Sequence, residues 1–264
     1  MRPKKFLGQH FLKDKNIALK IVSKVGNYRK ILEVGPGKGI LTQYLIKLKK
    51  VDLVLVEIDK ESVFYLKENF PALEKNIIHE DFLRLNLYKL FEKQFCLIGN
   101  FPYNISSQIF FKALDYKDLI TEIVCMIQKE VADRIKSGPG SKNYGILSVL
   151  LQTYYDIEHM FNVSEQVFEP PPKVKSSVIR FRRNQRNGLP CNEKLYFRIV
   201  KAGFNHRRKM LKNSLESFLL NLPDNNFLLK RRPEQMSIED FIELTTWIEN
   251  EQRKSGNILT NYNN

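Results

Sequence analysis

The residues of this sequence that are best suited to chemistry form a short turn, Asn100-Phe101-Pro102-Tyr103, directly after the apolar residues 96–98. Pro102 fixes its own φ near a turn value and restricts Phe101 to an extended conformation, so backbone carbonyls here can point away from a helix. The side-chain amide oxygen of Asn100 and a neighbouring main-chain carbonyl could then accept both hydrogens of an exocyclic amine. Tyr103 offers a flat face on which a nucleobase can stack. These four residues form a candidate catalytic site.

The amine that this turn fits is N6 of adenine. Its lone pair is delocalised into the ring, which makes it a poor nucleophile. Two acceptors that bind its hydrogens would favour the pyramidal amine that attacks a methyl donor. The alternative is that Asn-x-Pro forms only a turn, because a match at three fixed positions can arise by chance in a chain of this length.

A second candidate site is the glycine-rich turn at residues 35–39, which follows the strand-like residues 31–34. Its glycines permit positive φ values and let a ligand approach the backbone. The spacing Gly-x-Gly-x-Gly differs from the dinucleotide-binding pattern Gly-x-Gly-x-x-Gly, and no Gly-Lys-Ser/Thr sequence follows to bind phosphates. On its own, this turn is weak evidence for a ligand site.

Two carboxylates strengthen the case for a ligand. Glu57 follows the predicted strand 53–56, twenty residues beyond Gly37, where an acid can bind both hydroxyls of a ribose. Asp81 follows the predicted strand 76–79 and is placed to accept from the exocyclic amine of a bound adenine ring. Together they describe a pocket for an adenosyl group without phosphates, and we expect no metal and no nicotinamide there. The alternative is that both are solvated loop carboxylates.

An α/β sheet would bring these turns together. The apolar runs predict helices at residues 17–25, 105–114 and 128–134, and strands at residues 31–34, 53–56, 76–79, 96–98, 123–127, 147–155 and 174–181. Alternating strands and helices followed by a terminal strand pair indicate a twisted, mainly parallel sheet with helices on both faces. Because ligands bind beyond the carboxyl ends of the strands in such sheets, the candidate residues would meet at one edge.

The composition changes at residues 182–190, a polar and basic segment that contains Gly188 and Pro190. We interpret this segment as a linker between a catalytic domain at residues 1–185, which includes an N-terminal arm, and a helical domain at residues 192–254. The helical domain is basic, and Arg207, Arg208 and Lys209 are candidates for phosphate contacts with RNA. The alternative is a solvated basic helix face.

The charge of the whole chain also indicates a polyanionic partner. Its 264 residues are 43% hydrophobic and carry a formal net charge of +14. Nucleic acid is the first candidate; a membrane surface is the second, because no long basic amphipathic helix is evident. The three cysteines lack Cys-x-x-Cys spacing and are typical of reduced packing residues. No apolar run has the length of a signal peptide core or a membrane span, so we expect a cytoplasmic protein.

Five motifs, in this order along the chain, resemble those of the ribosomal RNA adenine N6,N6-dimethyltransferases: Gly8-Gln9-His10-Phe11-Leu12, Glu33-Val34-Gly35-Pro36-Gly37, Asn100-Phe101-Pro102-Tyr103-Asn104-Ile105-Ser106, Gln128-Lys129-Glu130-Val131 and Phe204-Asn205-His206-Arg207-Arg208-Lys209. The likeness runs from Lys4 to about Leu244 and is greatest to the bacterial small-subunit branch. It implies a Rossmann-like methyltransferase sheet that uses S-adenosylmethionine, with a small helical C-terminal domain that helps to dock on the pre-ribosomal small subunit. It further implies double N6 methylation of two adjacent adenosines near the 3′ end of small-subunit ribosomal RNA, and we expect a monomeric enzyme.

The resemblance also implies a set of cofactor-binding residues: His10, Leu12, Gly35, Gly37, Glu57, Asp81 and Asn100. In this set Glu57 binds the ribose, Asp81 meets the adenine of the cofactor, and Asn100 stands between cofactor and target base. The family usually has Asn in place of His10, which leaves open whether His10 contributes its side chain or only its backbone. It usually has Leu in place of Phe101, a change that alters the pocket wall without removing an acceptor.

Three other functions remain open at this point. The large-subunit rRNA methylases that confer antibiotic resistance share the catalytic motifs, but the basic segment 204–209 and the segment 231–235 fit the small-subunit branch better. A DNA adenine methyltransferase more typically has Pro in place of Phe101. A non-catalytic RNA-binding assembly factor would have a decayed site, whereas Gly35, Glu57, Asp81 and Asn100 are all in place.

Overall fold

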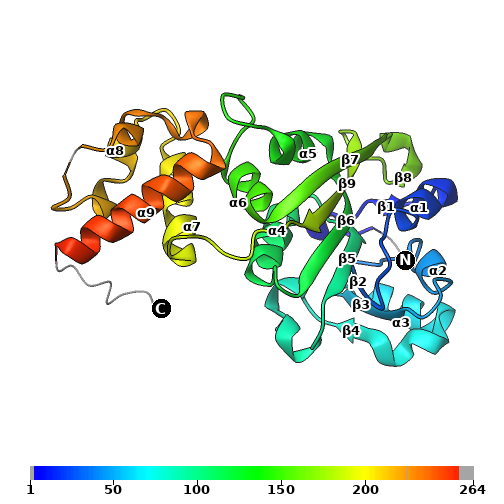
Figure 1. Ribbon diagram of the computed structural model, residues 1–264. Coiled ribbons are helices and arrows are strands. Elements are labelled where there is room, and N and C mark those ends of the chain that lie inside the picture. The colour runs from blue at the N-terminus through cyan, green and yellow to red at the C-terminus, as the bar shows by residue number, and fades with distance from the viewer. Residues whose placement is uncertain (1–2, 224, 256–264) are drawn as a thin grey trace. The chain divides into compact units, whose positions relative to one another are not determined.

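The computed structural model describes residues 3–223 and 225–255 (Figure 1). The chain forms two compact units, one of residues up to Ala132 together with Tyr155–Asn184, and one of Asp133–Tyr154 together with the residues from Gln185 onward. The two units divide near the predicted linker. They differ from the predicted domains in one segment, because Asp133–Tyr154 groups with the C-terminal residues.

The first unit contains a seven-stranded sheet in the order β4-β3-β2-β5-β6-β9-β7. Its strands are β2 (Lys30–Val34), β3 (Asp52–Glu57), β4 (Ile77–His79), β5 (Phe95–Asn100), β6 (Ile120–Gln128), β7 (Tyr155–Val163) and β9 (Ser176–Arg183). Strands β2 to β6 run parallel, and β9 is antiparallel to both β6 and β7. The first five residues of β5 are all buried, as expected for a parallel strand that is covered on both faces.

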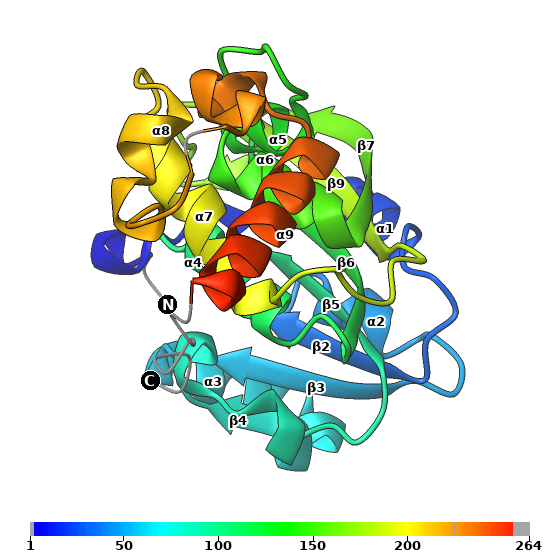
Figure 2. The ribbon, with the colours of Figure 1, turned by 60° about the vertical axis from the view of Figure 1, so that its left-hand side comes forward.

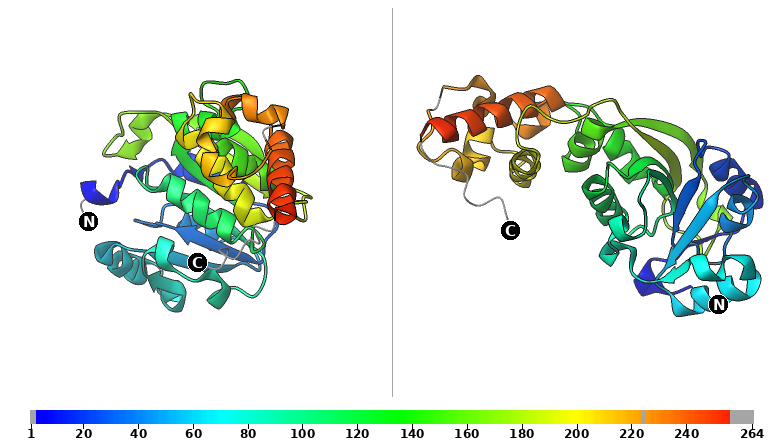
Figure 3. Two further views of the ribbon diagram at one scale, coloured as in Figure 1. Left: turned by 90° about the vertical axis from the view of Figure 1, so that its left-hand side faces the viewer. Right: turned by 60° about the horizontal axis from the view of Figure 1, so that its bottom comes forward.

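Helices cover both faces of this sheet (Figures 2 and 3). They are α1 (Lys15–Val22), α2 (Thr42–Leu45), α3 (Lys60–Asn69) and α4 (Ser106–Asp115), and α5 (Lys129–Lys136) follows β6. Ile21 of α1, Leu45 of α2 and Leu66 of α3 share one core cluster with residues of β2, β3 and β5. Phe110 of α4 packs against Phe181 of β9, with ring centroids 5.1 Å apart. The predicted Rossmann-like arrangement of a mainly parallel sheet between helices is confirmed.

One predicted strand is wrong. Residues 147–154 of the predicted strand 147–155 lie in helix α6 (Ile146–Tyr154), and the edge strand β7 begins only at Tyr155. Seven of the nine side chains of α6 are buried, namely Leu147, Ser148, Val149, Leu150, Leu151, Thr153 and Tyr154. A helix that is buried on almost every side has no polar face, so its sequence lacks the 3.6-residue period and imitates a buried strand. The terminal antiparallel pair is therefore β7 and β9.

The described residues of the second unit are helical, without strands. Besides α6, its helices are α7 (Glu193–Asn205), α8 (Leu211–Ser214) and α9 (Ile238–Lys254). Asn192 caps α7 by accepting from the backbone of Leu195 at 2.9 Å, and its own N–H donates to Glu249 of α9 at 2.7 Å. Ser237 and Asp240 form a capping box at the start of α9. Within the described ranges, no helix has the length and apolar character needed to cross a membrane.

Candidate active site

A cavity of about 270 Å³ lies at the carboxyl ends of β2, β3 and β5. Strands β2 and β5 are neighbours in the sheet although β3 and β4 come between them in the chain, and ligands bind at such a reversal of strand order. The cavity brings together most of the predicted site residues: His10, Gly35, Gly37, Glu57, Asp81, Asn100, Phe101, Pro102 and Tyr103. Leu12 does not line it. Leu12 is 4% exposed and pairs with Phe168 in a two-stranded sheet of β1 (Phe11–Leu12) and β8 (Phe168–Glu169).

At the glycine turn the backbone itself lines the cavity, because Gly35 and Gly37 have no side chains. Gly35 and Gly37 have φ values of +64° and +55°, a region that side chains disfavour. A Cβ atom on Gly37 would lie 2.8 Å from the ring of Phe11. The turn is tied to the next strand, because the N–H of Gly37 donates to Glu57 Oε2 at 3.0 Å.

Glu57 ends β3 and is 4% exposed. Its two oxygens accept from backbone only, from Gly37 at 3.0 Å and from Asp59 at 2.9 Å. Burial raises the pKa of Glu57 above its ordinary value, and hydrogen bonds from backbone N–H groups partly offset this rise. Each carboxylate oxygen has a second lone pair, so Glu57 can still accept from two neighbouring hydroxyls, as a ribose presents them.

Asp81 follows β4 and caps the short 3-10 helix Phe82–Arg84. Its Oδ1 atom accepts from the N–H of Leu83 at 2.9 Å, and its Oδ2 atom lies 3.7 Å from Arg84 Nε. The side chain is 28% exposed and lines the cavity. Asp81 is therefore held by its own turn and can accept a further hydrogen bond from a ligand.

Asn100 is the last residue of β5, and its amide has a defined orientation. The Nδ2 atom donates to the backbone carbonyl of His10 at 2.9 Å. Because a carbonyl can only accept, this contact identifies the amide nitrogen and leaves the amide oxygen on the other side. Among the residues that the structure describes, none donates to that oxygen. It is the acceptor that an exocyclic amine requires.

The remaining residues of the catalytic turn support Asn100 in different ways. The N–H of Phe101 donates to Met126 at 3.1 Å, and the carbonyl of Pro102 accepts from Ile105 at 3.2 Å. Phe101 is 1% exposed, and its ring packs edge-on against Phe110 of α4, so it lies mostly in the core. The Tyr103 hydroxyl is 2.6 Å from the Ser176 hydroxyl, which fixes the ring at the cavity wall.

His10 takes part through both its backbone and its ring. Its carbonyl holds Asn100, and its ring nitrogen Nδ1 lies 2.8 Å from the carbonyl of Pro170. The ring centroids of His10 and Tyr103 are 5.4 Å apart, with the planes inclined by 30°. The contact of His10 to the Asn100 amide therefore comes from its backbone and does not depend on its side chain.

The cavity also contains residues of the N-terminal arm that are not among the predicted site residues. Phe6 and Gly8 of the N-terminal arm line it, and Lys4 fixes the arm through ion pairs with Asp59 at 2.5 Å and Glu61 at 3.0 Å. The buried carboxylate of Asp59 also accepts from the Ser62 hydroxyl at 2.8 Å. The basic, aromatic composition of the arm was a signal of such a role, but nothing in the sequence paired Lys4 with a residue more than fifty positions away.

The basic segment of the second unit divides into two kinds of residue. Arg207 Nε donates to Glu234 at 2.8 Å and its Nη2 atom donates to the carbonyl of Ser141 at 3.2 Å. Arg208 and Lys209 are exposed, and neither forms an ion pair with any residue that the structure describes. Arg208 and Lys209 are thus accessible to a polyanion, whereas the guanidinium group of Arg207 binds other residues of the protein.

Comparisons with known proteins show which family the chain belongs to. The family model "Ribosomal RNA adenine dimethylase" matches residues 1–250. The ribosomal RNA small subunit methyltransferase A of Parabacteroides distasonis is 54% identical over 264 residues, which cover 98% of this chain and 99% of that protein. The protein of the same name from Phocaeicola vulgatus is 59% identical over 254 residues, which cover 94% of this chain and 90% of that protein.

Two solved structures share the fold. A dimethyladenosine transferase from Plasmodium falciparum has a TM-score of 0.74 and 24% identity, with 94% of this chain and 98% of that chain covered. The 23S rRNA methyltransferase ErmE has a TM-score of 0.63 and 24% identity, with 89% of this chain and 99% of that chain covered. Both solved structures therefore share the fold described above.

Proposed function

Because the chain belongs to the ribosomal RNA adenine dimethylase family, we propose that it methylates N6 of two adjacent adenosines near the 3′ end of small-subunit ribosomal RNA. Each adenosine receives two methyl groups from S-adenosylmethionine. The single observation that carries the proposal is the unpaired amide oxygen of Asn100, which the carbonyl of His10 holds in place at the cavity.

The cavity residues fit S-adenosylmethionine, which supplies an electrophilic methyl group on a sulfonium when it is bound. Glu57 would bind the ribose hydroxyls, because its carboxylate contacts only backbone N–H groups and retains two lone pairs. Asp81 would accept from the adenine amine of the cofactor, and the Gly35–Gly37 backbone would lie along it. A buried carboxylate and a glycine turn without a phosphate-binding sequence favour an adenosyl group over a nucleotide.

In the reaction, Asn100 would accept one hydrogen of the target amine while a carbonyl of the turn accepts the other, and Tyr103 would provide a face for the base. This arrangement holds N6 in line with the methyl group, and such orientation can supply several kcal/mol of the barrier. No general base is needed, because the attacking amine is neutral and its extra proton becomes acidic once the methyl group has arrived. Water can take that proton.

Arg208 and Lys209 would hold the RNA by phosphate contacts, and the helical second unit would dock on the pre-ribosomal small subunit. The first unit would be the methyltransferase domain. We infer that a monomer acts in the cytoplasm, where its ribosomal substrate assembles.

The large-subunit alternative has one observation in its favour, the fold shared with ErmE. At 24% identity that likeness concerns the fold alone. The relatives at 54% and 59% identity are named as small-subunit methyltransferases, and this supports the small-subunit substrate.

The test is transfer of labelled methyl groups from S-adenosylmethionine to undermethylated small ribosomal subunits. Large subunits, intact 70S particles and duplex DNA serve as comparison substrates. We expect label in the small-subunit RNA alone, and loss of that label with Asn100→Ala. Label in the large-subunit RNA would support the alternative, and absence of label from every substrate would contradict the proposal.

A further inference from the structure

Helix α4 carries a lysine, Lys112, whose side chain points into the protein. Lys112 is 9% exposed. Lysines are almost never buried unless a partner compensates the charge, because removing an ammonium group from water is costly. Burial lowers the pKa of Lys112, in keeping with this cost. A buried lysine beside an active site therefore calls for an explanation in terms of what it contacts.

The ammonium group of Lys112 holds the turn that follows Asp81. It donates to the carbonyl of Leu83 at 3.0 Å and to the carbonyl of Leu85 at 2.5 Å. It also lies 5.5 Å from the ring centroid of Phe82, within reach of a cation–π interaction. Contacts to Phe82, Leu83 and Leu85 fix the path of this turn against α4.

The same turn holds the carboxylate of Asp81. The N–H of Leu83 donates to Asp81 Oδ1 at 2.9 Å, while the carbonyl of Leu83 accepts from Lys112. The N–H of Arg84 donates to the carbonyl of Asp81 at 2.9 Å. Leu83 thus connects the lysine to the carboxylate through its own two peptide groups, and a shift of this residue would move Asp81 within the cavity.

We propose that Lys112 is a positioning residue that orients the Asp81 carboxylate toward the adenine amine of the bound methyl donor. The proposal rests on the function proposed above, in which Asp81 accepts from that amine. Lys112 does not line the cavity, so it acts on the ligand through Asp81, by way of the turn 82–85 and by the interaction of its charge with that carboxylate. Since α4 begins just after the catalytic turn, one helix supports both the base pocket and the adenine side of the cofactor pocket.

The experiment compares two ligands by calorimetry: S-adenosylhomocysteine and its analogue whose purine lacks the 6-amino group. Lys112→Met keeps the length of the side chain and removes the charge. We expect it to weaken binding of S-adenosylhomocysteine about tenfold, or about 1.4 kcal/mol, and to leave the analogue within threefold of wild type. Lys89→Met is the matched control, because Lys89 is exposed in the following 3-10 helix, Leu87–Lys89. It should change neither affinity.

A double-mutant cycle with Asp81→Asn tests whether Lys112 acts on the ligand through Asp81. If Lys112 acts through Asp81, the double variant binds S-adenosylhomocysteine as weakly as Asp81→Asn alone. Equal weakening of both ligands, full additivity in the cycle, or unchanged affinity in Lys112→Met would each overturn the proposal.

Thermal unfolding shows whether Lys112→Met is folded. Should that variant not fold, Lys112→Arg replaces it, because its guanidinium keeps the charge and the donors but changes their geometry. An arginine variant that loses preference for the amino-bearing ligand supports the proposal, and one that keeps wild-type affinity for both ligands, or weakens both equally, overturns it. Wild-type protein that bound neither ligand would contradict the proposed function itself, and the role of Lys112 with it.

Discussion

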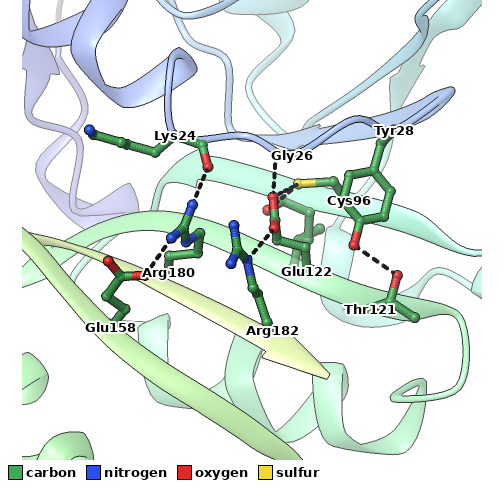
Figure 4. Close-up of polar contacts among 10 residues, drawn as sticks. Lys24, Gly26, Tyr28, Cys96, Thr121, Glu122, Glu158, Arg180 and Arg182 are labelled. Carbon is green, nitrogen blue, oxygen red and sulfur yellow. Dashed lines mark hydrogen bonds and ion pairs between the residues drawn. The ribbon is translucent and has the colours of Figure 1, made fainter. Parts of the chain in front are cut away.

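The two ends of the central sheet each contain a buried glutamate, and the two glutamates differ in their partners. At the carboxyl ends of the parallel strands, Glu57 is 4% exposed and accepts only from backbone N–H groups at the edge of a cavity. At the opposite end, Glu122 near the start of β6 is 2% exposed. It accepts from Gly26 at 2.6 Å and from Arg182 Nε at 3.3 Å (Figure 4).

The surroundings of Glu122 are saturated with contacts. The Cys96 thiol also approaches its carboxylate, at 3.9 Å, and burial raises the pKa of Cys96, which keeps it a thiol. Nearby, Arg180 pairs with Glu158 and donates to the carbonyl of Lys24 at 3.3 Å (Figure 4). The comparison teaches that burial alone does not identify a functional carboxylate. A carboxylate with a cation and a backbone partner joins elements, whereas one that has only backbone partners beside a cavity can bind a ligand.

The largest effect that this comparison predicts is at the cavity end. Asn100→Ala removes the unpaired acceptor, and we expect the single-turnover rate of methyl transfer to fall by about 10²–10³, as for other donors and acceptors that act in the transition state. Binding of S-adenosylmethionine should stay within a few-fold of wild type. Full single-turnover activity in this variant would remove Asn100 from the chemistry.

At the opposite end we expect a loss of stability without a loss of function. Glu122→Ala removes two hydrogen bonds to a carboxylate, each worth about 1.5 kcal/mol or more, so the free energy of unfolding should fall by about 3 kcal/mol. Glu158→Ala is the control, because Glu158 is itself exposed and its removal should cost less than that of the buried Glu122. Denaturant unfolding measures both. A changed affinity for S-adenosylmethionine in the folded Glu122→Ala protein would contradict the division between the two ends.

Glu57→Ala should show the reverse of Glu122→Ala, namely a loss of ligand binding without a comparable loss of stability. We expect the binding of S-adenosylmethionine to weaken by about 1.5–3 kcal/mol, the range for hydrogen bonds to a charged group. Calorimetry that gave equal affinities for wild type and variant would exclude Glu57 from the site.

The affinity for S-adenosylmethionine should also depend on pH through Glu57. Burial raises the pKa of this carboxyl, and only the ionised form offers both oxygens as acceptors to the ribose. Affinity should therefore fall as the pH falls through that raised pKa. Glu57→Gln should bind more weakly but without this dependence, and an unchanged pH profile in the glutamine variant would assign the titration to another group.

The smallest effect concerns the RNA contacts of the second unit. Arg208→Ala should reduce the slope of log K against log salt by about 0.7 for each lost phosphate contact, if the RNA there is single-stranded. Arg207→Ala should leave the slope unchanged, because Arg207 is bound to Glu234 and Ser141. Equal effects of the two variants would show that the internal contacts of Arg207 open when RNA binds.

Most of the sheet and the outline of the cavity could be predicted from the sequence, because they rest on local signals. Gly35, Glu57 and Asn100 each stand at the end of a strand-like run, and the parallel order of the strands brings such ends together. For this reason the sequence alone predicts the cavity residues that lie at the strand ends.

The rest depends on contacts between residues that are distant in the chain. Nothing near Lys112 in the sequence indicates that its ammonium group binds carbonyls 27 and 29 positions away. The sequence likewise gives no sign of the ion pair between Arg207 and Glu234, or of the strand pairing that places Leu12 away from the cavity. The sequence predicts a strand where α6 lies, because a helix that is buried on nearly all sides lacks the 3.6-residue hydrophobic period.

The central claim is that the site at Asn100 catalyses two methyl transfers to the same amine. The chemistry of the second transfer bears directly on this claim. After the first transfer the monomethyl amine retains one hydrogen to donate. The lost hydrogen bond costs about 0.5–1.5 kcal/mol, or roughly tenfold in rate at most, so the intermediate remains a usable substrate. Phe101 is 1% exposed but lines the cavity next to Asn100, so its side chain bounds the space that is left for the first methyl group.

Mass spectrometry of digested RNA over a time course tests this claim most directly. Undermethylated small subunits are incubated with the protein and excess S-adenosylmethionine. The account predicts that N6-monomethyladenosine forms transiently and is converted to N6,N6-dimethyladenosine at two adjacent positions. A monomethyl product that accumulates without conversion would contradict the claim and identify Phe101 as the obstruction to test first.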